Sequence, residues 1–236
     1  MHLFAMADLH LSLDGKKPMH VFGELWRDHP ARMAEAWDAV VSPEDQVLLA
    51  GDLSWARKLS EAGQDLAWIA ERPGSKLLLR GNHDSWWASR SKLAAALDPS
   101  CAVLQNDAHE WGDWVIIGAR GWLAPDDPIA TEADGKIFER ELERLEASIA
   151  DADRRFGTER PRIAMAHYPP WLVGREPTAV VERLRRAGVK HCVYGHLHGE
   201  DHAMALTGTH DSVTFHFVAV DANAFKPVRL PVEPRP

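Results

Sequence analysis

The chain of 236 residues is 45% hydrophobic and 26% charged; this is typical of a soluble globular protein with one sizeable core, so we expect a single domain over residues 1–236. A formal net charge of −8 argues against a surface that binds long nucleic acid through its phosphates, and no apolar run approaches the roughly 20 residues of a membrane span. Two cysteines do not make a disulfide framework, and the first ten residues do not resemble a signal peptide, so we expect a cytoplasmic protein.

Short apolar runs recur along the chain and predict strands. The predicted strands are residues 3–7, 47–50, 76–80, 115–119, 162–166 and 191–195, followed by a β-rich tail at 202–208 and 213–220. Helical spacing of apolar residues predicts helices over 29–41, 65–72, 89–97 and 136–156, with a further helix capped by Thr178. Strands that alternate with helices indicate an α/β domain in which helices cover mixed sheets.

Side chains that can bind a metal directly follow five of the predicted strands. They are Asp8 with His10, Asp52 after Gly51, Asn82 with His83 and Asp84, His167, and His196 with His198. One Gly-Asp or one histidine alone is weak evidence, because Asp is common in turns and a single histidine is more often a satisfied core residue. Ligands in open α/β sheets gather beyond the carboxyl ends of strands, so the joint pattern is informative.

Carboxylates and imidazoles that converge without lysine or arginine would repel or stay unsatisfied, and a cation resolves this. Against the two carboxylates Asp8 and Asp52, two divalent ions leave a positive site that attracts phosphate even on an acidic protein. Mixed nitrogen and oxygen ligands without thiolate suit Mn²⁺, Fe or Zn²⁺. Such a pair of ions can clamp both the attacking and the leaving oxygen of a displacement at phosphorus.

The motifs ADLHL, AGDLSWA, RGNHD, AHYPP and YGHLHG lie in this order between residues 7 and 199. Together they resemble the five blocks of the calcineurin-like metallophosphoesterases. The resemblance implies a four-layer α/β/β/α sandwich of two mixed sheets with a dinuclear metal centre. By position it implies a first metal on Asp8, His10 and His198, a second on Asn82, His167 and His196, Asp52 as the bridge, His83 as a proton donor that binds no metal, and Asp84 as the residue that orients His83.

The chain departs from two subfamilies that the motifs also bring to mind. Protein Ser/Thr phosphatases carry a phosphate-clamping arginine where this sequence has Ala56, and Arg57 is one position away. The long extensions of the family's DNA-repair nucleases are absent. The pair GDLSWA and RGNHDSWW is most similar to a bacterial phosphohydrolase branch whose substrate the resemblance does not supply. We therefore expect a small phosphodiester, nucleotide or phosphomonoester substrate, with a nuclease or protein phosphatase as alternatives.

Two non-enzymatic interpretations were weighed against hydrolysis. A scaffold of the same fold with weak or lost catalysis would typically lose metal ligands, yet every ligand position here is filled. A structural zinc protein would favour closed four-ligand sites, usually with cysteine, and neither cysteine lies in a motif. Both alternatives are less favoured than a metal-dependent phosphohydrolase in which hydroxide attacks the phosphate ester in line.

Arginine and tryptophan residues beside the strand ends are candidates for substrate contacts. Arg57, Arg80 and Arg120 could contact a phosphate, or each could pair with a surface carboxylate. Trp55, Trp86, Trp122 and Trp171 could line the cleft or stack on a flat group, or they could simply pack the edge of the core. Trp86 and Trp87 are also expected to begin the helix that follows them.

Overall fold

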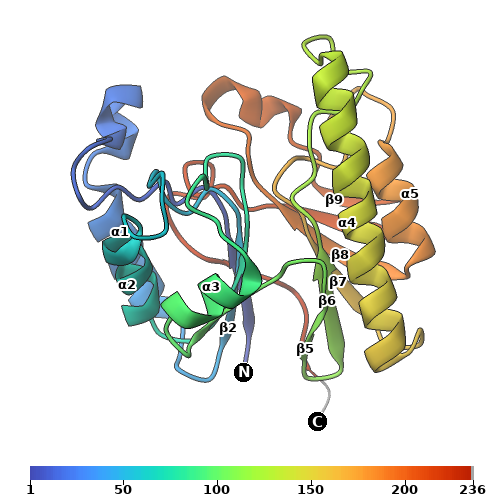
Figure 1. The fold of residues 1–236 in the computed structure, drawn as a ribbon, viewed down its shortest axis with the longest axis horizontal. Helices are drawn as coiled ribbons and strands as arrows, with labels where there is room; N and C mark the ends of the chain where they lie inside the picture. Colours follow the sequence, from blue (N-terminus) through green and yellow to red (C-terminus); the bar gives the residue numbers. More distant parts are fainter. Residues whose placement is uncertain (235–236) are drawn as a thin grey trace.

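The computed structural model describes residues 1–234 and contains two sheets packed face to face, with helices on both outer faces (Figure 1). This arrangement confirms the expected α/β/β/α sandwich. Among the described residues, no helix is both long and apolar enough to cross a bilayer.

The first sheet has five strands in the order β11-β1-β2-β3-β4, and all pairs are parallel except the antiparallel pair β1–β11. Its strands are β1 (Leu3–Met6), β2 (Gln46–Ala50), β3 (Ser75–Leu79), β4 (Cys101–Val103) and β11 (Val228–Arg229). The helices α1 (His29–Val40), α2 (Gly63–Glu71) and α3 (Arg90–Ala96) cover its outer face.

The second sheet has six strands in the order β5-β6-β7-β8-β10-β9, with antiparallel edge pairs β5–β6 and β9–β10 and parallel pairs between. Its strands are β5 (His109–Trp111), β6 (Trp114–Gly118), β7 (Arg162–Met165), β8 (Val189–Tyr194), β9 (Gly208–His210) and β10 (Val213–Phe217). The helices α4 (Glu132–Phe156) and α5 (Ala179–Arg186) cover it.

Strand alternation divides the core into three apolar layers. Along β2, Val47 and Leu49 pack with the helices of the first sheet, whereas Leu48 and Ala50 pack between the two sheets. Successive side chains of a strand point to opposite faces, so a strand that is apolar throughout is buried on both sides. All four of these side chains are fully buried, which explains why a continuous apolar run, rather than an alternating one, marks the strands.

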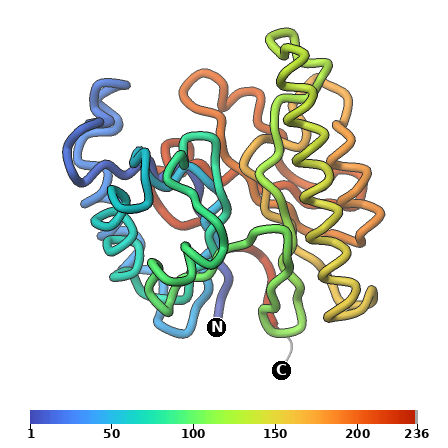
Figure 2. The backbone as a smooth tube through the Cα atoms, viewed as in Figure 1, coloured from blue at the N-terminus to red at the C-terminus, as the bar shows by residue number. Residues whose placement is uncertain are grey.

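The two sheets are linked by a contact between the segments that follow β1 and β10. Ala7 pairs with Ala219 as an isolated bridge, and the Ala7 amide donates to the Val218 carbonyl at 2.9 Å. The backbone in Figure 2 brings the N-terminal (blue) and C-terminal (red) segments side by side. The bridge places the residue after Ala7 and the segment after Ala219 next to each other, although they are distant in sequence.

Several sequence-based expectations about elements were wrong. Residues 202–208 do not form a strand: Gly199–Met204 is a 3-10 helix, and β9 begins at Gly208. In this 3-10 helix the His202 ring contacts Asp221, with Nε2 3.0 Å from Oδ2. Trp86 and Trp87 lie in a turn and a loop before α3, which starts at Arg90. The short strands β4, β5 and β11 were not predicted, whereas the helix capped by the Thr178 side chain was.

Candidate metal centre

The loop after β1 and the loop after β2 run side by side and carry three of the candidate ligands. The Asp8 amide donates to the Gly51 carbonyl and the His10 amide to the Asp52 carbonyl, each at 2.9 Å. These bonds continue the parallel pairing of β1 with β2 beyond the end of the sheet. The side chains of Asp8, His10 and Asp52 are thereby held on a rigid backbone rather than on mobile loops.

Four of the predicted ligands have a left-handed backbone conformation. The φ angles are 64° at Asp8, 46° at His10, 53° at Asp52 and 76° at His196. L-residues other than glycine rarely adopt positive φ, although Asn, Asp and His do so more readily than others. Each such residue costs about 1–3 kcal/mol unless its surroundings enforce it, and such residues cluster at functional sites. The reversal turns the chain sharply at the strand end and directs each side chain over the sheet.

Glycines beside the ligands are required because the ligands approach the backbone closely. A Cβ added to Gly81 would lie 2.0 Å from Asp52 Oδ1, and one added to Gly195 would lie 2.2 Å from Asp8 Oδ2. A Cβ on Gly51 would lie 2.6 Å from the Nδ1 atom of His167, and Gly51 itself has φ +96°. These contacts explain physically why the GD, GNHD and GH motifs begin with glycine.

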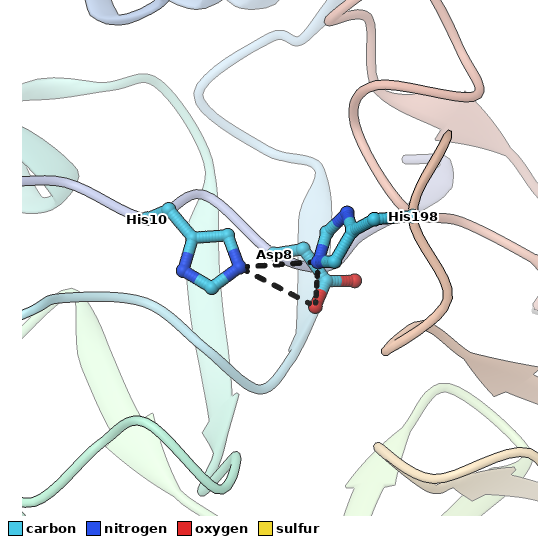
Figure 3. A group of neighbouring side chains, drawn as sticks. All are labelled: Asp8, His10 and His198. Atoms are coloured by element: carbon cyan, nitrogen blue, oxygen red, sulfur yellow. Dashed lines mark hydrogen bonds and ion pairs between the residues drawn. The ribbon is translucent and has the colours of Figure 1, made fainter. Parts of the chain in front are cut away.

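Asp8, His10 and His198 converge as one group (Figure 3). The Nε2 atoms of the two histidines are 3.2 Å apart, and each lies near Asp8 Oδ1, at 4.0 Å from His10 and 3.6 Å from His198. All three atoms point into the same small space. One cation placed there could contact a carboxylate oxygen and two imidazole nitrogens, which suits a first-row transition metal ion.

A second group forms around Asn82. Its Oδ1 atom lies 2.7 Å from His167 Nε2 and 3.1 Å from His196 Nδ1. Asp52 stands between the two groups: its Oδ2 atom is 3.8 Å from His10 Nε2 and 3.4 Å from His167 Nε2. The structure thus brings together all seven residues predicted as ligands, in the two sets that the sequence motifs imply.

Buried carboxylates here have pKa values that diverge. Burial raises the pKa of Asp8 to about 7. Burial would also raise the pKa of Asp52, but the neighbouring His167 outweighs it and the pKa falls below its usual range. Burial would lower the pKa of His167, yet the charge of Asp52 raises it to about 9. Burial lowers the pKa of His196 to about 3. These shifts show that the protein groups alone do not balance the buried charges of the site.

The donor set fits divalent metal ions. Asp8 is fully buried, and its Oδ1 atom has no hydrogen-bond partner among the described residues. The ion pairs of Asp8 and Asp52 found in residues 1–234 involve histidines only, with no lysine or arginine. An orphaned carboxylate oxygen of this kind is costly in a protein interior. A cation at this position would remove that cost.

Asp221 is a residue of this region that the sequence analysis missed. Its Oδ1 atom lies 3.1 Å from Nδ1 of His198, and its Oδ2 atom lies 3.0 Å from Nε2 of His202. A carboxylate on the far nitrogen of a metal-binding histidine fixes the ring orientation and its tautomer. The signal was present, because Asp221 directly follows the predicted strand 213–220, which is a sixth strand end with a side chain that can bind metal.

His83 lies at the mouth of the site and outside both ligand groups. Its backbone amide donates to Asp52 Oδ1 at 2.8 Å, and its Nε2 atom is 4.0 Å from Asp52 Oδ2. Its side chain is 44% exposed. Trp55 packs on both His83 and His10, with ring centroids at 4.3 Å and 4.8 Å. Burial lowers the pKa of His83, and the nearby Lys17 lowers it further.

The prediction that Asp84 orients the His83 ring is wrong, because the hydrogen bonds of the Asp84 carboxylate go to other groups. The fully buried Asp84 carboxylate accepts from the amides of Leu53, Ser54 and Gly81 and from the indole of Trp86. These four donors occupy both oxygens, and Asp84 therefore fixes the loop that carries His83 rather than the ring itself.

Trp86 does not line the cleft, because it is only 2% exposed and its indole nitrogen donates to Asp84 Oδ1 at 2.9 Å. It belongs to the apolar core. Trp171, also weighed as a stacking residue, packs edge-on against Phe215 at 6.3 Å. Of the tryptophans weighed for stacking, Trp55 is the one whose ring packs on predicted ligand rings. Trp26, which the sequence analysis did not single out, also lies edge-on to His10 and His198 at 5.9 Å and 5.7 Å.

The three candidate arginines lie in two places. Arg57 lines a cavity with Lys17 and Trp55, beside the His83 side of the site. Arg120 donates to Glu141 at 2.8 Å, and so is paired with a carboxylate. Arg80 lines a separate cavity of about 80 Å³ together with Arg120. None of the seven predicted ligands lines either cavity. The Arg57 cavity is nearer to the site in one respect, since Trp55 in its wall packs on His10 and His83.

Comparisons with known proteins agree with this geometry. A family model described as calcineurin-like phosphoesterase matches residues 1–200. The Gene 66 protein of Mycobacterium phage L5 is 39% identical over 80 residues, which are 33% of this chain and 37% of that protein. The corresponding protein of phage D29 is 42% identical over 57 residues, 24% of this chain and 28% of that protein. The matches thus span little more than a third of these relatives' length.

Two solved structures share the fold at low identity. Phosphopantetheinyl hydrolase from Mycobacterium tuberculosis superposes with a TM-score of 0.63 at 14% identity, covering 99% of this chain and 96% of that one. A protein of unknown function from Aquifex aeolicus superposes with a TM-score of 0.53 at 17% identity, covering 97% and 95%. Since the family model covers most of the sequence, this chain belongs to the calcineurin-like phosphoesterases.

Proposed function

We propose that the protein hydrolyses a small phosphate ester with two divalent metal ions, one on Asp8, His10 and His198 and the other on Asn82, His167 and His196. The observation that carries this proposal is the position of Asp52. Its Oδ2 atom lies within 3.8 Å of a histidine nitrogen from each set, as a carboxylate that bridges two ions must. Manganese, iron and zinc suit the mixed nitrogen and oxygen donors.

Each protein group has a distinct role in this proposal. Two bound ions supply an activated water and neutralise charge that develops on the phosphate. His83 donates a proton to the departing oxygen, and its 44% exposed side chain is accessible to a bound ester. Asp84 positions His83 through the loop backbone, and Asp221 orients the His198 ring through its Nδ1 atom.

The preferred substrate class is inferred from the net charge of the chain and from the absence of an arginine at position 56. The net charge of −8 disfavours long nucleic acid. Ala56 occupies the position of the arginine that clamps phosphate in protein Ser/Thr phosphatases. A small phosphodiester, nucleotide or phosphomonoester is therefore the preferred substrate, with a nuclease as the second candidate within the enzyme class.

A metal-supplemented substrate screen tests the proposal. The purified chain would be loaded separately with Mn²⁺, Fe²⁺ and Zn²⁺ and compared with a chelated control. The substrates would be p-nitrophenyl phosphate, bis-p-nitrophenyl phosphate, cyclic nucleotides, nucleotide phosphates, duplex DNA and a phosphoprotein. We expect metal-dependent turnover of a small ester above that of either polymer. Salt-sensitive cleavage of DNA without turnover of any small ester would overturn the substrate class.

Elemental analysis tests the number of ions. The loaded chain should approach two equivalents, and Asp52→Ala should lose more metal than Asp8→Ala because only Asp52 lies between both sets. Saturation at one equivalent in the unmodified chain would contradict the dinuclear site even if the enzyme is active.

A further inference from the structure

An apolar pocket opens directly beside the second ligand set. Tyr168 follows His167 in sequence, and its ring packs on the ring of His196 with centroids 3.9 Å apart. Beyond this pair the pocket is lined by Trp122, Leu172, Leu197 and Met204, among others. We call it the Tyr168 pocket. Because His196 forms part of its wall, anything held in the pocket is next to the metal centre.

The Tyr168 pocket is large enough for an organic group. Its volume is about 190 Å³, whereas one water needs only about 10–15 Å³ and an apolar cavity of about 150 Å³ binds benzene. The rings of Trp122 and Tyr168 in its wall contact each other, with centroids 4.8 Å apart and planes tilted by 43°. Pockets of this composition bind the apolar portion of small ligands.

Charges at the rim restrict what the far end of the ligand can be. Four carboxylates line the pocket, those of Asp126, Asp127, Glu176 and Asp201, against the single guanidinium of Arg175. A ligand that reaches this rim with a second phosphate or a carboxylate would meet like charge. An uncharged or cationic end would not.

We propose that the Tyr168 pocket holds the organic group that is esterified to the substrate's phosphate. This group is apolar or aromatic, and its end away from the phosphate is uncharged or cationic. The inference rests on the proposed function, because it places the phosphate at the metal centre. It narrows the substrate class to phosphate esters whose organic group carries no second anionic group at the end that reaches the rim of the Tyr168 pocket.

Non-hydrolysable phosphonates separate the pocket from the chemistry. Four probes would be used: methylphosphonate, benzylphosphonate, 4-carboxybenzylphosphonate and 4-(aminomethyl)benzylphosphonate. Their binding to the Mn²⁺-loaded full chain would be measured by calorimetry and, where turnover exists, as competitive inhibition. Burial of one ring predicts that benzylphosphonate binds at least about tenfold more tightly than methylphosphonate. The aminomethyl probe should bind several-fold more tightly than the carboxy probe.

Two variants and a matched control locate the effect. Leu172→Gln and Met204→Gln place an amide in the pocket and should remove most of the benzyl preference while leaving methylphosphonate affinity unchanged. Val173→Gln changes a neighbouring residue that is 52% exposed and does not line the pocket, and it should keep the preference. Thermal unfolding of each variant checks that the fold is retained.

The outcomes distinguish this inference from the proposed function. Equal binding of the methyl and benzyl probes, tighter binding of the carboxy probe, or an unchanged preference in both pocket variants would overturn the inference even if esters are hydrolysed. If no ester is hydrolysed with any metal, the proposed function fails, and calorimetry still decides whether the pocket prefers an aromatic group.

Discussion

The two flanks of the candidate metal centre differ in charge and in shape. On one flank, Trp55 packs on His10 at 4.8 Å, and the cavity beside it is lined by Lys17 and Arg57. On the other flank, Tyr168 packs on His196 at 3.9 Å and forms the apolar Tyr168 pocket. An aromatic ring packs on a predicted ligand on both flanks. Cationic and carboxylate side chains are equal in number around the Trp55 cavity, whereas four carboxylates and one arginine line the apolar pocket on the Tyr168 flank.

This difference indicates how a substrate would be oriented. The Lys17 ammonium lies 3.0 Å from the centroid of the Trp55 ring, a cation–π contact. Burial and the charge of Arg57 both lower the pKa of Lys17, and no carboxylate within residues 1–234 is among the groups that shift it. It is available to an anion. We expect phosphate oxygens to face the Trp55 flank and an organic ester group to face the Tyr168 flank. Four predictions break or sharpen this comparison.

The largest effect should come from His83 on the Trp55 flank. His83→Asn should lower kcat by about 10²–10⁴, the usual contribution of general acid–base catalysis, without loss of either metal. The loss should be smaller for a good leaving group such as p-nitrophenolate, because that oxygen needs little protonation. Measurements of kcat against leaving-group pKa, paired with elemental analysis, check this.

His20→Asn is the matched control and should leave kcat unchanged, because His20 is an exposed residue on a 3-10 helix (Met19–Phe22) and is not a predicted site residue. Loss of a metal from His83→Asn would make His83 a ligand. An equal loss of kcat for good and poor leaving groups would show that His83 stabilises charge rather than donating a proton.

The extent to which sequence anticipated this site has a physical explanation. All seven predicted ligands converge because parallel strands deliver their carboxyl ends to one edge, and a residue that directly follows a strand has little freedom of position. Asp221 was overlooked although it obeys the same rule, since the strand before it was interpreted only as part of a β-rich tail.

Contacts between side chains were less predictable than positions along the chain. Trp86 is adjacent to the site in sequence, yet it is buried because its indole satisfies Asp84. Asp84 follows His83 directly, but the amides of Leu53 and Ser54 compete for the same oxygen. These partners come from the loop after β2, about 30 residues earlier in the chain, and no local pattern around Asp84 reveals them.

The pH dependence of metal binding should differ between the flanks by up to about 100-fold. Burial raises the pKa of Asp8, on the Trp55 flank, to about 7. Against the effect of burial, Asp52 raises the pKa of His167, on the Tyr168 flank, to about 9. A metal must displace the proton from each group, so affinity rises about tenfold per pH unit below that group's pKa and then levels.

Between pH 7 and 9 the ion on the Tyr168 flank should therefore gain more affinity than the ion on the Trp55 flank. Calorimetric titration with Mn²⁺ in buffers of different ionisation enthalpy would count the protons released at each step. His167→Gln removes the group whose pKa is raised to about 9 and should weaken the dependence above pH 7. A dependence that ends at pH 7 for both ions in the unmodified chain would contradict the assignment.

Lys17 should have a moderate effect on substrate binding. Lys17→Gln is expected to raise KM for p-nitrophenyl phosphate roughly three- to tenfold, because a partly exposed charge near a phosphate contributes modestly. The increase should shrink in high salt. Lys190→Gln, at an exposed lysine on β8, makes the same change in net charge and should leave KM within error. A fall in kcat with unchanged KM would instead place Lys17 in the transition state.

The smallest effect is expected at the rim of the Tyr168 pocket. Glu176 is exposed, so solvent screens its charge, and Glu176→Lys should strengthen binding of 4-carboxybenzylphosphonate only about two- to threefold. It should weaken the aminomethyl probe by a similar factor and leave methylphosphonate unchanged, since that probe does not reach the rim. Glu44→Lys makes the same charge change just before β2, at the amino end of the strands and away from the metal centre. If Glu44→Lys alters the carboxy probe as much as Glu176→Lys does, the effect reflects net charge alone. An effect confined to Glu176→Lys and to the charged probes would instead mean that the far end of the ligand lies against the acidic rim of the Tyr168 pocket.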